Sequence, residues 1–197
     1  MLYLASKSPR RRELLARLGL SFGLLDLDIP EQRQPGEPAE EYVRRVAREK
    51  AGAGLLSVVG NPTAVVLGSD TEVILDDEVF GKPRDDAHAR EMLRRLAGRT
   101  HAVVSAVSLV SPSRETQVVS VSQVTFDPID DAQIDAYLAT GEHVGKAGAY
   151  ASQGAAEAFV ARLDGSFSGV MGLPLRETSR LLREFGLLPA TTRPAAP

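Results

Sequence analysis

The chain has 197 residues, of which 43% are hydrophobic and 25% charged, so its composition is that of a globular protein with a sizeable core. It contains no cysteine, which excludes disulfides, a thiolate nucleophile and a cysteine-ligated zinc site. The formal net charge of −3 and the absence of tryptophan argue against a general nucleic-acid binder, and no apolar stretch is long enough to span a membrane.

The N-terminal half of the sequence alternates strand and helix patterns. Ser8 followed by Pro9 is a typical helix start, and Gly19 is a typical helix end. A later apolar run meets a turn at Asp76–Asp77 and a short returning strand, which predicts a hairpin. We expect helices over residues 8–18 and 39–53, a loop over 29–38, and strands over 2–5, 21–27, 63–75 and 78–80, the last two forming the hairpin.

The C-terminal half combines a second hairpin with helices and a glycine-rich segment. We expect helices over residues 85–96, 130–138 and 173–185, hairpin strands over 101–110 and 116–126, the glycine-rich segment over 141–154 and a further strand over 158–163. Because strands and helices are interleaved while two hairpins interrupt the parallel pattern, we predict an α/β fold with a mixed β-sheet and flanking helices. A single domain is expected over residues 1–188, with a disordered tail over 189–197.

Four cations crowd around the start of the first helix: Lys7, Arg10, Arg11 and Arg12. Unpaired N–H groups and the helix dipole favour an anion there, and arginines bind phosphate oxygens through paired hydrogen bonds. Each exposed cation at a helix start is destabilising by roughly 0.3–1 kcal/mol, so several of them indicate a bound anion. The alternative is a solvated basic face with Ser8 as an ordinary N-cap.

Two further residues suit phosphate chemistry. Asp70 follows a buried strand pattern, a position where carboxylates often bind a hard cation, and Mg²⁺ needs only one or two carboxylates beside phosphate oxygens. A plain turn or surface aspartate is an equally weighted alternative. Lys82 stands on a rigid turn between Gly81 and Pro83, where it would offer a fixed charge to phosphate, although solvated turn lysines are more common.

The glycine-rich segment Gly145–Gly154 allows close approach of a ligand, and it carries Lys146 and Gln153. The amide of Gln153 can both donate to and accept from the edge of a nucleobase. The sequence has neither a GxxxxGK[ST] loop nor a GxGxxG fingerprint after a strand, so a ligand-free flexible loop is the alternative. Residues 165–175 are expected to form a glycine-punctuated turn that packs or shapes a cleft.

The three histidines have no metal-ligand spacing and no serine lies in a G-x-S-x-G elbow, so the histidines are interpreted as surface or structural residues. The remaining candidates are cations, one well-placed carboxylate and an amide. Together they suit a site for a nucleoside polyphosphate with a divalent metal.

Three motifs resemble the Maf family of nucleoside triphosphate pyrophosphatases, once named as septum-formation inhibitors. They are LASKSPRRRELL, GSDT with GKP, and KAGAYASQG with GSFSGVMGLPLRET, and the resemblance runs from Leu2 to about Leu187. EQRQP at residues 31–35 and Gln153 before Gly154 resemble the dTTP/UTP-hydrolysing branch. The branch that acts on 7-methyl-GTP tends to carry Glu in place of this Gln.

The resemblance implies an elongated mixed sheet in two lobes around a cleft, similar to inosine triphosphate pyrophosphatases, and cleavage between the α- and β-phosphates. It implies that Asp70 is the general base or metal ligand, that Glu31 assists with the Mg²⁺ or Mn²⁺, and that Gln153 contacts the base. The residues expected to hold the triphosphate are Ser8, Arg10, Arg11, Lys50 and Lys82, the last also counted as catalytic with Asp70 and Glu31. The chain departs from the family pattern at Ser69, where Ala is usual, and at Gly145, where Asp is frequent.

Other functions stay open at this point. A nucleotide-binding regulator of cell division with little turnover and a 7-methyl-GTP pyrophosphatase are the alternatives to a dTTP/UTP pyrophosphatase. The expected partner is a nucleoside triphosphate, with no nucleic acid and no membrane, and a homodimer is left open. The absence of cysteine and of a signal-peptide charge order favours a cytoplasmic location.

Overall fold

The computed structural model describes residues 1–189, so all but the first residue of the expected tail 189–197 lies outside the described residues. The elements in chain order are β1 (Leu2–Ala5), α1 (Pro9–Ala16), β2 (Phe22–Leu25), α2 (Ala39–Ser57), β3 (Val65–Leu75), β4 (Glu78–Phe80), α3 (Asp86–Leu96), β5 (Thr100–Ser111), β6 (Arg114–Phe126), α4 (Asp131–Leu138), the 3-10 turns η1 (Ala147–Ala149) and η2 (Ala155–Phe159), β7 (Val160–Asp164), α5 (Phe167–Val170) and α6 (Leu175–Glu184). No helix among these residues is long and apolar enough to cross a membrane.

The strands form one seven-stranded sheet in the order β2-β1-β3-β5-β6-β7, with β4 paired to β3. β1 runs parallel to β2 and β3, whereas every other pairing is antiparallel. The parallel pairs arise where helices connect the strands, and the antiparallel pairs include the two hairpins. The prediction of a mixed sheet with flanking helices is therefore confirmed.

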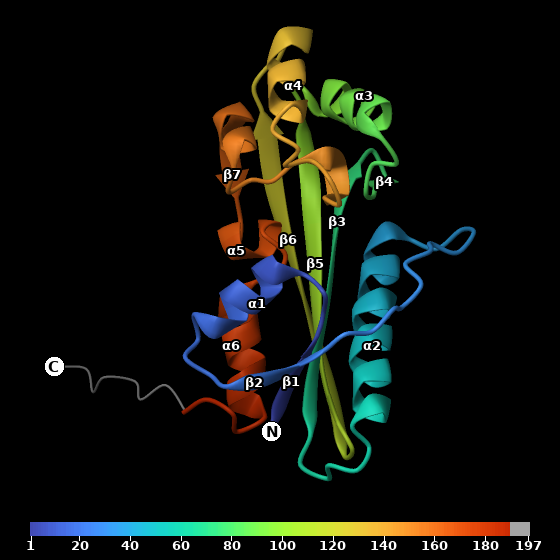
Figure 1. The fold of residues 1–197 in the computed structure, drawn as a ribbon, viewed down its shortest axis with the longest axis vertical. Coiled ribbons are helices and arrows are strands. Elements are labelled where there is room, and N and C mark those ends of the chain that lie inside the picture. The colour runs from blue at the N-terminus through green and yellow to red at the C-terminus, as the bar shows by residue number, and fades with distance from the viewer. Residues whose placement is uncertain (190–197) are drawn as a thin grey trace, which may run out of the picture.

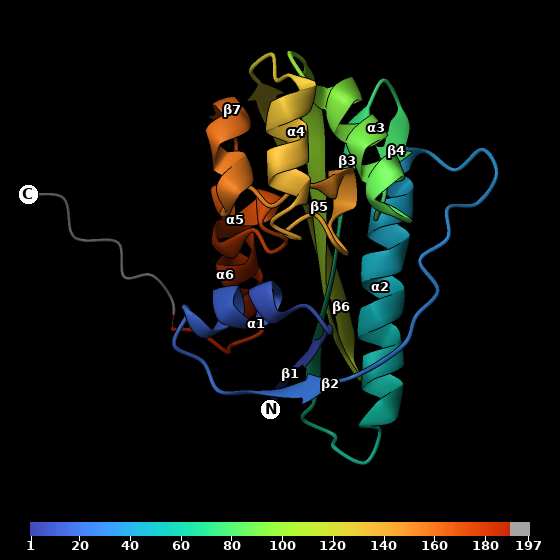
Figure 2. The same cartoon turned by 45° about the horizontal axis from the view of Figure 1, so that its top comes forward.

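The alternation of side chains along β5 separates the faces of the sheet. Val107 and Leu109 pack in a core with α1 and α6, while Val104 and Ala106 pack against α2. Accordingly, α2 and α6 flank the sheet on opposite sides (Figures 1 and 2).

Two apolar cores occupy the two ends of the face that carries α6. One gathers around Phe126 with α3 and α4, and the other gathers around Leu67 with α1 and α6. Figure 1 shows α3 and α4 at one end of the long strands and α1, α6, β1 and β2 toward the other. This arrangement gives the expected elongated molecule with two lobes.

Several boundaries differ from the predictions for identifiable reasons. The α2 helix runs one turn beyond residue 53, because Gly54 lets it approach the sheet, where a Cβ would lie 2.7 Å from Val66 Cγ1. The expected turn over 165–175 contains the short helix α5, which begins after Ser166, whose hydroxyl accepts the N–H of Gly169 at 3.0 Å. The first helix ends at Ala16 rather than at residue 18, and the last strand starts at Val160, after the 3-10 turn η2.

Candidate active site

A cavity of about 580 Å³ lies where the two lobes meet, since residues of both apolar cores line it. The β1–α1 connection, β3 and the 144–153 segment contribute to its walls. All eight residues that the sequence singled out line this cavity: Ser8, Arg10, Arg11, Glu31, Lys50, Asp70, Lys82 and Gln153. The structure thus brings them together, while the individual roles stay predictions.

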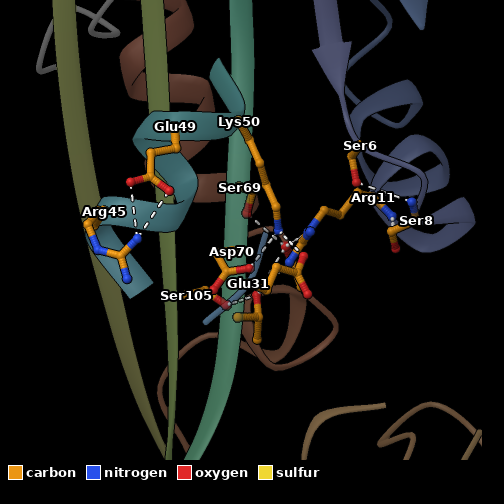
Figure 3. Close-up of polar contacts among 12 residues, drawn as sticks. Ser6, Ser8, Arg11, Glu31, Arg45, Glu49, Lys50, Ser69, Asp70 and Ser105 are labelled. Atoms are coloured by element: carbon orange, nitrogen blue, oxygen red, sulfur yellow. Dashed lines mark hydrogen bonds and ion pairs between the residues drawn. The ribbon is translucent and has the colours of Figure 1, made fainter. Parts of the chain in front are cut away.

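The start of α1 is built by local hydrogen bonds. Ser8 has an extended backbone and its hydroxyl accepts the N–H of Arg11 at 3.4 Å, while Ser6 Oγ accepts the N–H of Ser8 at 3.2 Å (Figure 3). Ser8 is therefore an N-cap, as its alternative interpretation expected, and it also faces the cavity. Lys7 is paired with Asp26 and Asp28 on the surface, at 3.3 and 3.5 Å.

Arg11 is held by neutral groups. Its Nε donates to the carbonyl oxygen of Gly172 at 2.8 Å, and its Nη2 donates to Thr71 Oγ1 at 3.2 Å. Burial lowers the pKa of Arg11, and the nearby carboxylates Asp70 and Glu31 oppose that shift. Neither Arg11 nor Arg10 forms an ion pair with a carboxylate within residues 1–189. A fixed guanidinium of this kind is suited to an anionic ligand.

Lysines and carboxylates form a compact cluster beside Arg11 in the cavity (Figure 3). Lys50 Nζ lies 2.7 Å from Asp70 Oδ1 and 2.6 Å from Glu31 Oε1 (Figure 3). Lys82 pairs with the other oxygen of Glu31. Burial disfavours the charge of Glu31, but the ammonium groups of Lys50 and Lys82 outweigh burial and lower the pKa of Glu31 to about 2. Lys50 and Asp70 are themselves buried, with 9% and 3% of their surfaces exposed.

This cluster depends on close packing between α2 and β3. A Cβ on Gly68 would lie 2.4 Å from the carbonyl oxygen of Ala47 and 2.5 Å from the N of Ala51. Only glycine therefore lets the backbone of α2 come near enough for Lys50 to reach Asp70, two residues further along β3. The sequence analysis had placed Lys50 on the helix but had no local signal for this contact.

Glu72 also lines the cavity, although the sequence analysis gave it no function. It lies two residues after Asp70 on β3, which puts both carboxyl groups on the same face of the strand. Its Oε2 and the Oδ2 of Asp70 are buried without a hydrogen-bond partner. Burial, followed by the charges of Asp70 and Glu31, raises the pKa of Glu72 to about 8. The available signal was a second acidic residue two positions after Asp70, within the same predicted strand.

The glycine-rich segment forms turns and 3-10 helices rather than an unstructured loop. Gly148 donates its N–H to the carbonyl oxygen of Gly81 at 3.2 Å, and a Cβ on Gly148 would lie 2.8 Å from Val73 Cγ2. Gly145 has a φ of 68°, a backbone conformation that explains glycine at this position. At the end of the segment, Gln153 is exposed at the cavity, where its amide can meet a ligand.

The buried histidines lie outside the cavity lining. His101 is paired with the hydroxyl of Tyr150 at 2.8 Å, and burial lowers its pKa to about 4. His143 Nε2 lies 2.9 Å from Asp86 Oδ1. Among the described residues, no three His, Cys, Asp or Glu side chains form a group that could hold a metal ion by themselves. The histidines accordingly have the structural surroundings that the sequence interpretation expected.

This chain is similar to known proteins along nearly its whole length. The family model described as "Maf-like protein" matches residues 1–185. The chain is 60% identical to the dTTP/UTP pyrophosphatase of Xanthomonas euvesicatoria pv. vesicatoria, with 94% of this chain and 99% of that protein covered. It is 57% identical to the dTTP/UTP pyrophosphatase of Methylococcus capsulatus, covering 94% and 91%, and 55% identical to the nucleoside triphosphate pyrophosphatase of Xylella fastidiosa, covering 94% and 98%.

Among solved structures, the Ham1 protein of Staphylococcus aureus matches with a TM-score of 0.46 and 14% identity, covering 64% of this chain and 71% of that one. The family match and the similarity to the full-length relatives together show that this chain belongs to the Maf family.

Proposed function

We infer that this chain is a nucleoside triphosphate pyrophosphatase that hydrolyses dTTP and UTP to the nucleoside monophosphate and pyrophosphate. Relatives named dTTP/UTP pyrophosphatase share 57–60% identity with 94% of its length. The observation that carries the inference is the cavity itself, where arginines, lysines and carboxylates from distant parts of the sequence converge. Phosphoryl transfer depends mainly on positioning and charge neutralisation, and this set of residues supplies both.

The cationic side chains would hold the triphosphate. Arg10 and Arg11 stand beside the α1 N-terminus without a carboxylate partner in the described residues, so they are free to bind phosphate oxygens. Lys50 and Lys82 add positive charge, once phosphate oxygens replace part of their contact with Glu31. Ser8 completes this phosphate-binding surface.

A divalent cation fits the acidic side of the site. The unpartnered Asp70 Oδ2 is a hard oxygen ligand, and Mg²⁺ or Mn²⁺ typically binds one or two carboxylates together with substrate phosphates. Asp70 would hold the ion with Glu31, whose two oxygens must first exchange their contacts with Lys50 and Lys82. When bound, the ion neutralises phosphate charge and acidifies water.

Asp70 would also position the attacking water. Lys50 fixes the carboxylate through Oδ1, which leaves Oδ2 to accept a hydrogen bond from a water molecule. A proton passes from the water to Asp70 Oδ2 as the water oxygen bonds to the α-phosphorus, and the bond from that phosphorus to the bridging oxygen breaks. The monophosphate keeps the new oxygen, and pyrophosphate leaves with its charge balanced by the arginines and by Lys82.

Gln153 is proposed to read the base. Uracil and thymine present an N3–H donor beside carbonyl acceptors, and an amide side chain offers one acceptor and one donor to such an edge. The exposed position of Gln153 on the rim of the cavity supports this role. We further propose a cytoplasmic enzyme that acts without a nucleic-acid or membrane partner. Light scattering of the purified protein would decide between a monomer and a homodimer.

Pyrophosphate release from a nucleotide panel tests the function. With Mg²⁺ or Mn²⁺ present, dTTP and UTP should be turned over much faster than GTP and 7-methyl-GTP, and absence of turnover with every nucleotide would favour a binding regulator instead. Asp70→Asn should lower kcat by at least about a hundredfold, as expected for loss of a proton-accepting catalytic group. Asp77→Asn, on the exposed turn before β4, is the matched control and should keep wild-type activity. An Asp70→Asn protein that is folded and fully active would contradict the assigned mechanism.

A further inference from the structure

Glu72 is a buried carboxyl group of the cavity that the preceding roles do not use. Only 7% of its surface is exposed, and it lies on the same face of β3 as Asp70. It also lines a smaller neighbouring cavity of about 420 Å³, where Tyr42 and Lys82 are among its neighbours. Glu72 therefore stands between the two cavities, within reach of groups in both.

The nearby lysines do not compensate Glu72. Lys50 is bound to Asp70 and Glu31, and Lys82 is bound to Glu31, so neither ammonium group is paired with Glu72 in the described chain. A buried carboxyl oxygen without a partner is destabilising, and such atoms in native proteins call for a specific explanation. Here two of them, Asp70 Oδ2 and Glu72 Oε2, lie on one strand face at one cavity.

We propose that Glu72 is a ligand of the divalent cation and shares that ion with Asp70. The inference rests on the proposed pyrophosphatase function, because two carboxylates are an incomplete set for Mg²⁺ or Mn²⁺ and the nucleotide phosphates supply further oxygens. This agrees with the absence, in the part of the chain that the structure describes, of a group of three or more side chains able to hold a metal alone. The ion is thus bound tightly only together with its nucleotide.

The position of Glu72 favours this role over that of Glu31. Both oxygens of Glu31 are paired with ammonium groups, whereas Glu72 Oε2 has no hydrogen-bond partner in the described residues. A cation can therefore approach Glu72 without displacing a lysine. Glu31 would join Asp70 and Glu72 only after exchanging its contacts with Lys50 and Lys82.

Direct metal binding tests the proposal independently of turnover. Mn²⁺ binding is measured by electron paramagnetic resonance in the presence of α,β-methylene-UTP, for the wild-type protein and for Glu72→Gln. The change removes the charge and keeps the shape of the side chain, so we expect at least about a tenfold rise in the Mn²⁺ dissociation constant. Nucleotide affinity without metal and the thermal midpoint should stay close to their wild-type values, which a purely structural role for Glu72 does not predict.

Glu78→Gln is the matched control, since Glu78 also lines the smaller cavity but is exposed and paired with Arg95. It should leave Mn²⁺ binding unchanged. An unchanged Mn²⁺ dissociation constant in folded Glu72→Gln would overturn the proposal. If that variant does not fold, Glu72→Asp carries the test: its shorter side chain should weaken Mn²⁺ binding several-fold, and wild-type affinity would overturn the role.

The wild-type assay separates this inference from the function on which it rests. If wild-type protein binds Mn²⁺ and releases pyrophosphate from UTP while Glu72→Gln binds Mn²⁺ equally well, only the role of Glu72 fails. If the wild-type protein releases no pyrophosphate from any nucleotide, the proposed function fails, whatever the metal affinity of the variant.

Discussion

Two groups of charged side chains that line the cavity differ in how their charges are balanced. On the lysine wall, defined by Lys50, Lys82, Glu31 and Asp70, each ammonium group already contacts a carboxylate. On the arginine wall, defined by Arg10 and Arg11 at the start of α1, the guanidinium groups have no such partner in the described residues. A triphosphate can therefore meet the arginine wall without breaking an ion pair, whereas the lysine wall must exchange partners. The arginine wall is suited to binding the incoming triphosphate, and the lysine wall is suited to exchanging its ion pairs during the reaction.

The largest expected effect on stability comes from removing Lys50, the buried residue at the centre of the lysine wall. Lys50→Met leaves Asp70 with a buried and uncompensated charge, so the free energy of unfolding should fall by about 3–5 kcal/mol. Urea unfolding measures this change. Adding Asp70→Asn to Lys50→Met should restore much of the loss, and two strictly additive effects would show that the ion pair is not the cause. Lys7→Met, which removes a lysine from an exposed pair, is the matched control and should change stability by less than about 0.5 kcal/mol.

The arginine wall should respond in activity more than in stability. Arg11→Lys keeps the positive charge but loses the planar fork that binds Gly172 and Thr71 and that we propose also binds a phosphate. Loss of one charge-assisted contact of about 1.5–3 kcal/mol corresponds to a fall in kcat/KM of about tenfold to a hundredfold. Steady-state pyrophosphate release from UTP measures it. The adjacent Arg12→Lys, on the exposed side of α1, should be neutral, and equal losses in the two variants would speak against a specific role for Arg11.

The smallest effect on stability is expected at the exposed end of the lysine wall. The Lys82 side chain is 58% exposed, so Lys82→Met should change the free energy of unfolding by less than about 1 kcal/mol although it removes an ion pair. Its kcat for UTP should nevertheless fall, because the side chain faces the cavity and would neutralise the leaving pyrophosphate. Chemical unfolding and turnover of the same preparation separate the two effects. A large loss of stability with unchanged kcat would reverse the roles assigned to Lys50 and Lys82.

The sequence was a good guide wherever the signal is local. The Ser8 cap, the turn at Asp76–Asp77 and the period of apolar residues predicted most elements to within a few residues. The extent of α2 was underestimated because its glycines resemble a helix end, whereas Gly54 is needed for contact with Val66. Such a contact is tertiary, and no neighbouring residue indicates it.

The candidate site shows the same limit. Motif resemblance located the eight cavity residues, but it did not reveal that Lys50 is paired with Asp70 and Glu31 at once. No role was predicted for Glu72, because its burial follows from the chain segments that cover β3 and not from its neighbours in the sequence. Which charges compensate one another is a property of the folded arrangement, and that property distinguishes the two walls.

The contact between Gly148 and Val73 has a consequence for which phosphate of a bound nucleotide lies beside Asp70. Val73 is three residues from Asp70 on the same strand, and Gly148 is anchored to it and to Gly81 within the segment that ends at Gln153. These contacts hold the segment that carries Gln153 against the strand that carries Asp70. The distance between the amide proposed to read the base and the carboxylate proposed to position the water is therefore fixed by the fold. If Gln153 binds the base as proposed, every substrate would place the same phosphorus beside Asp70. The bond that is hydrolysed would then depend on its distance from the base and not on the number of phosphates beyond it.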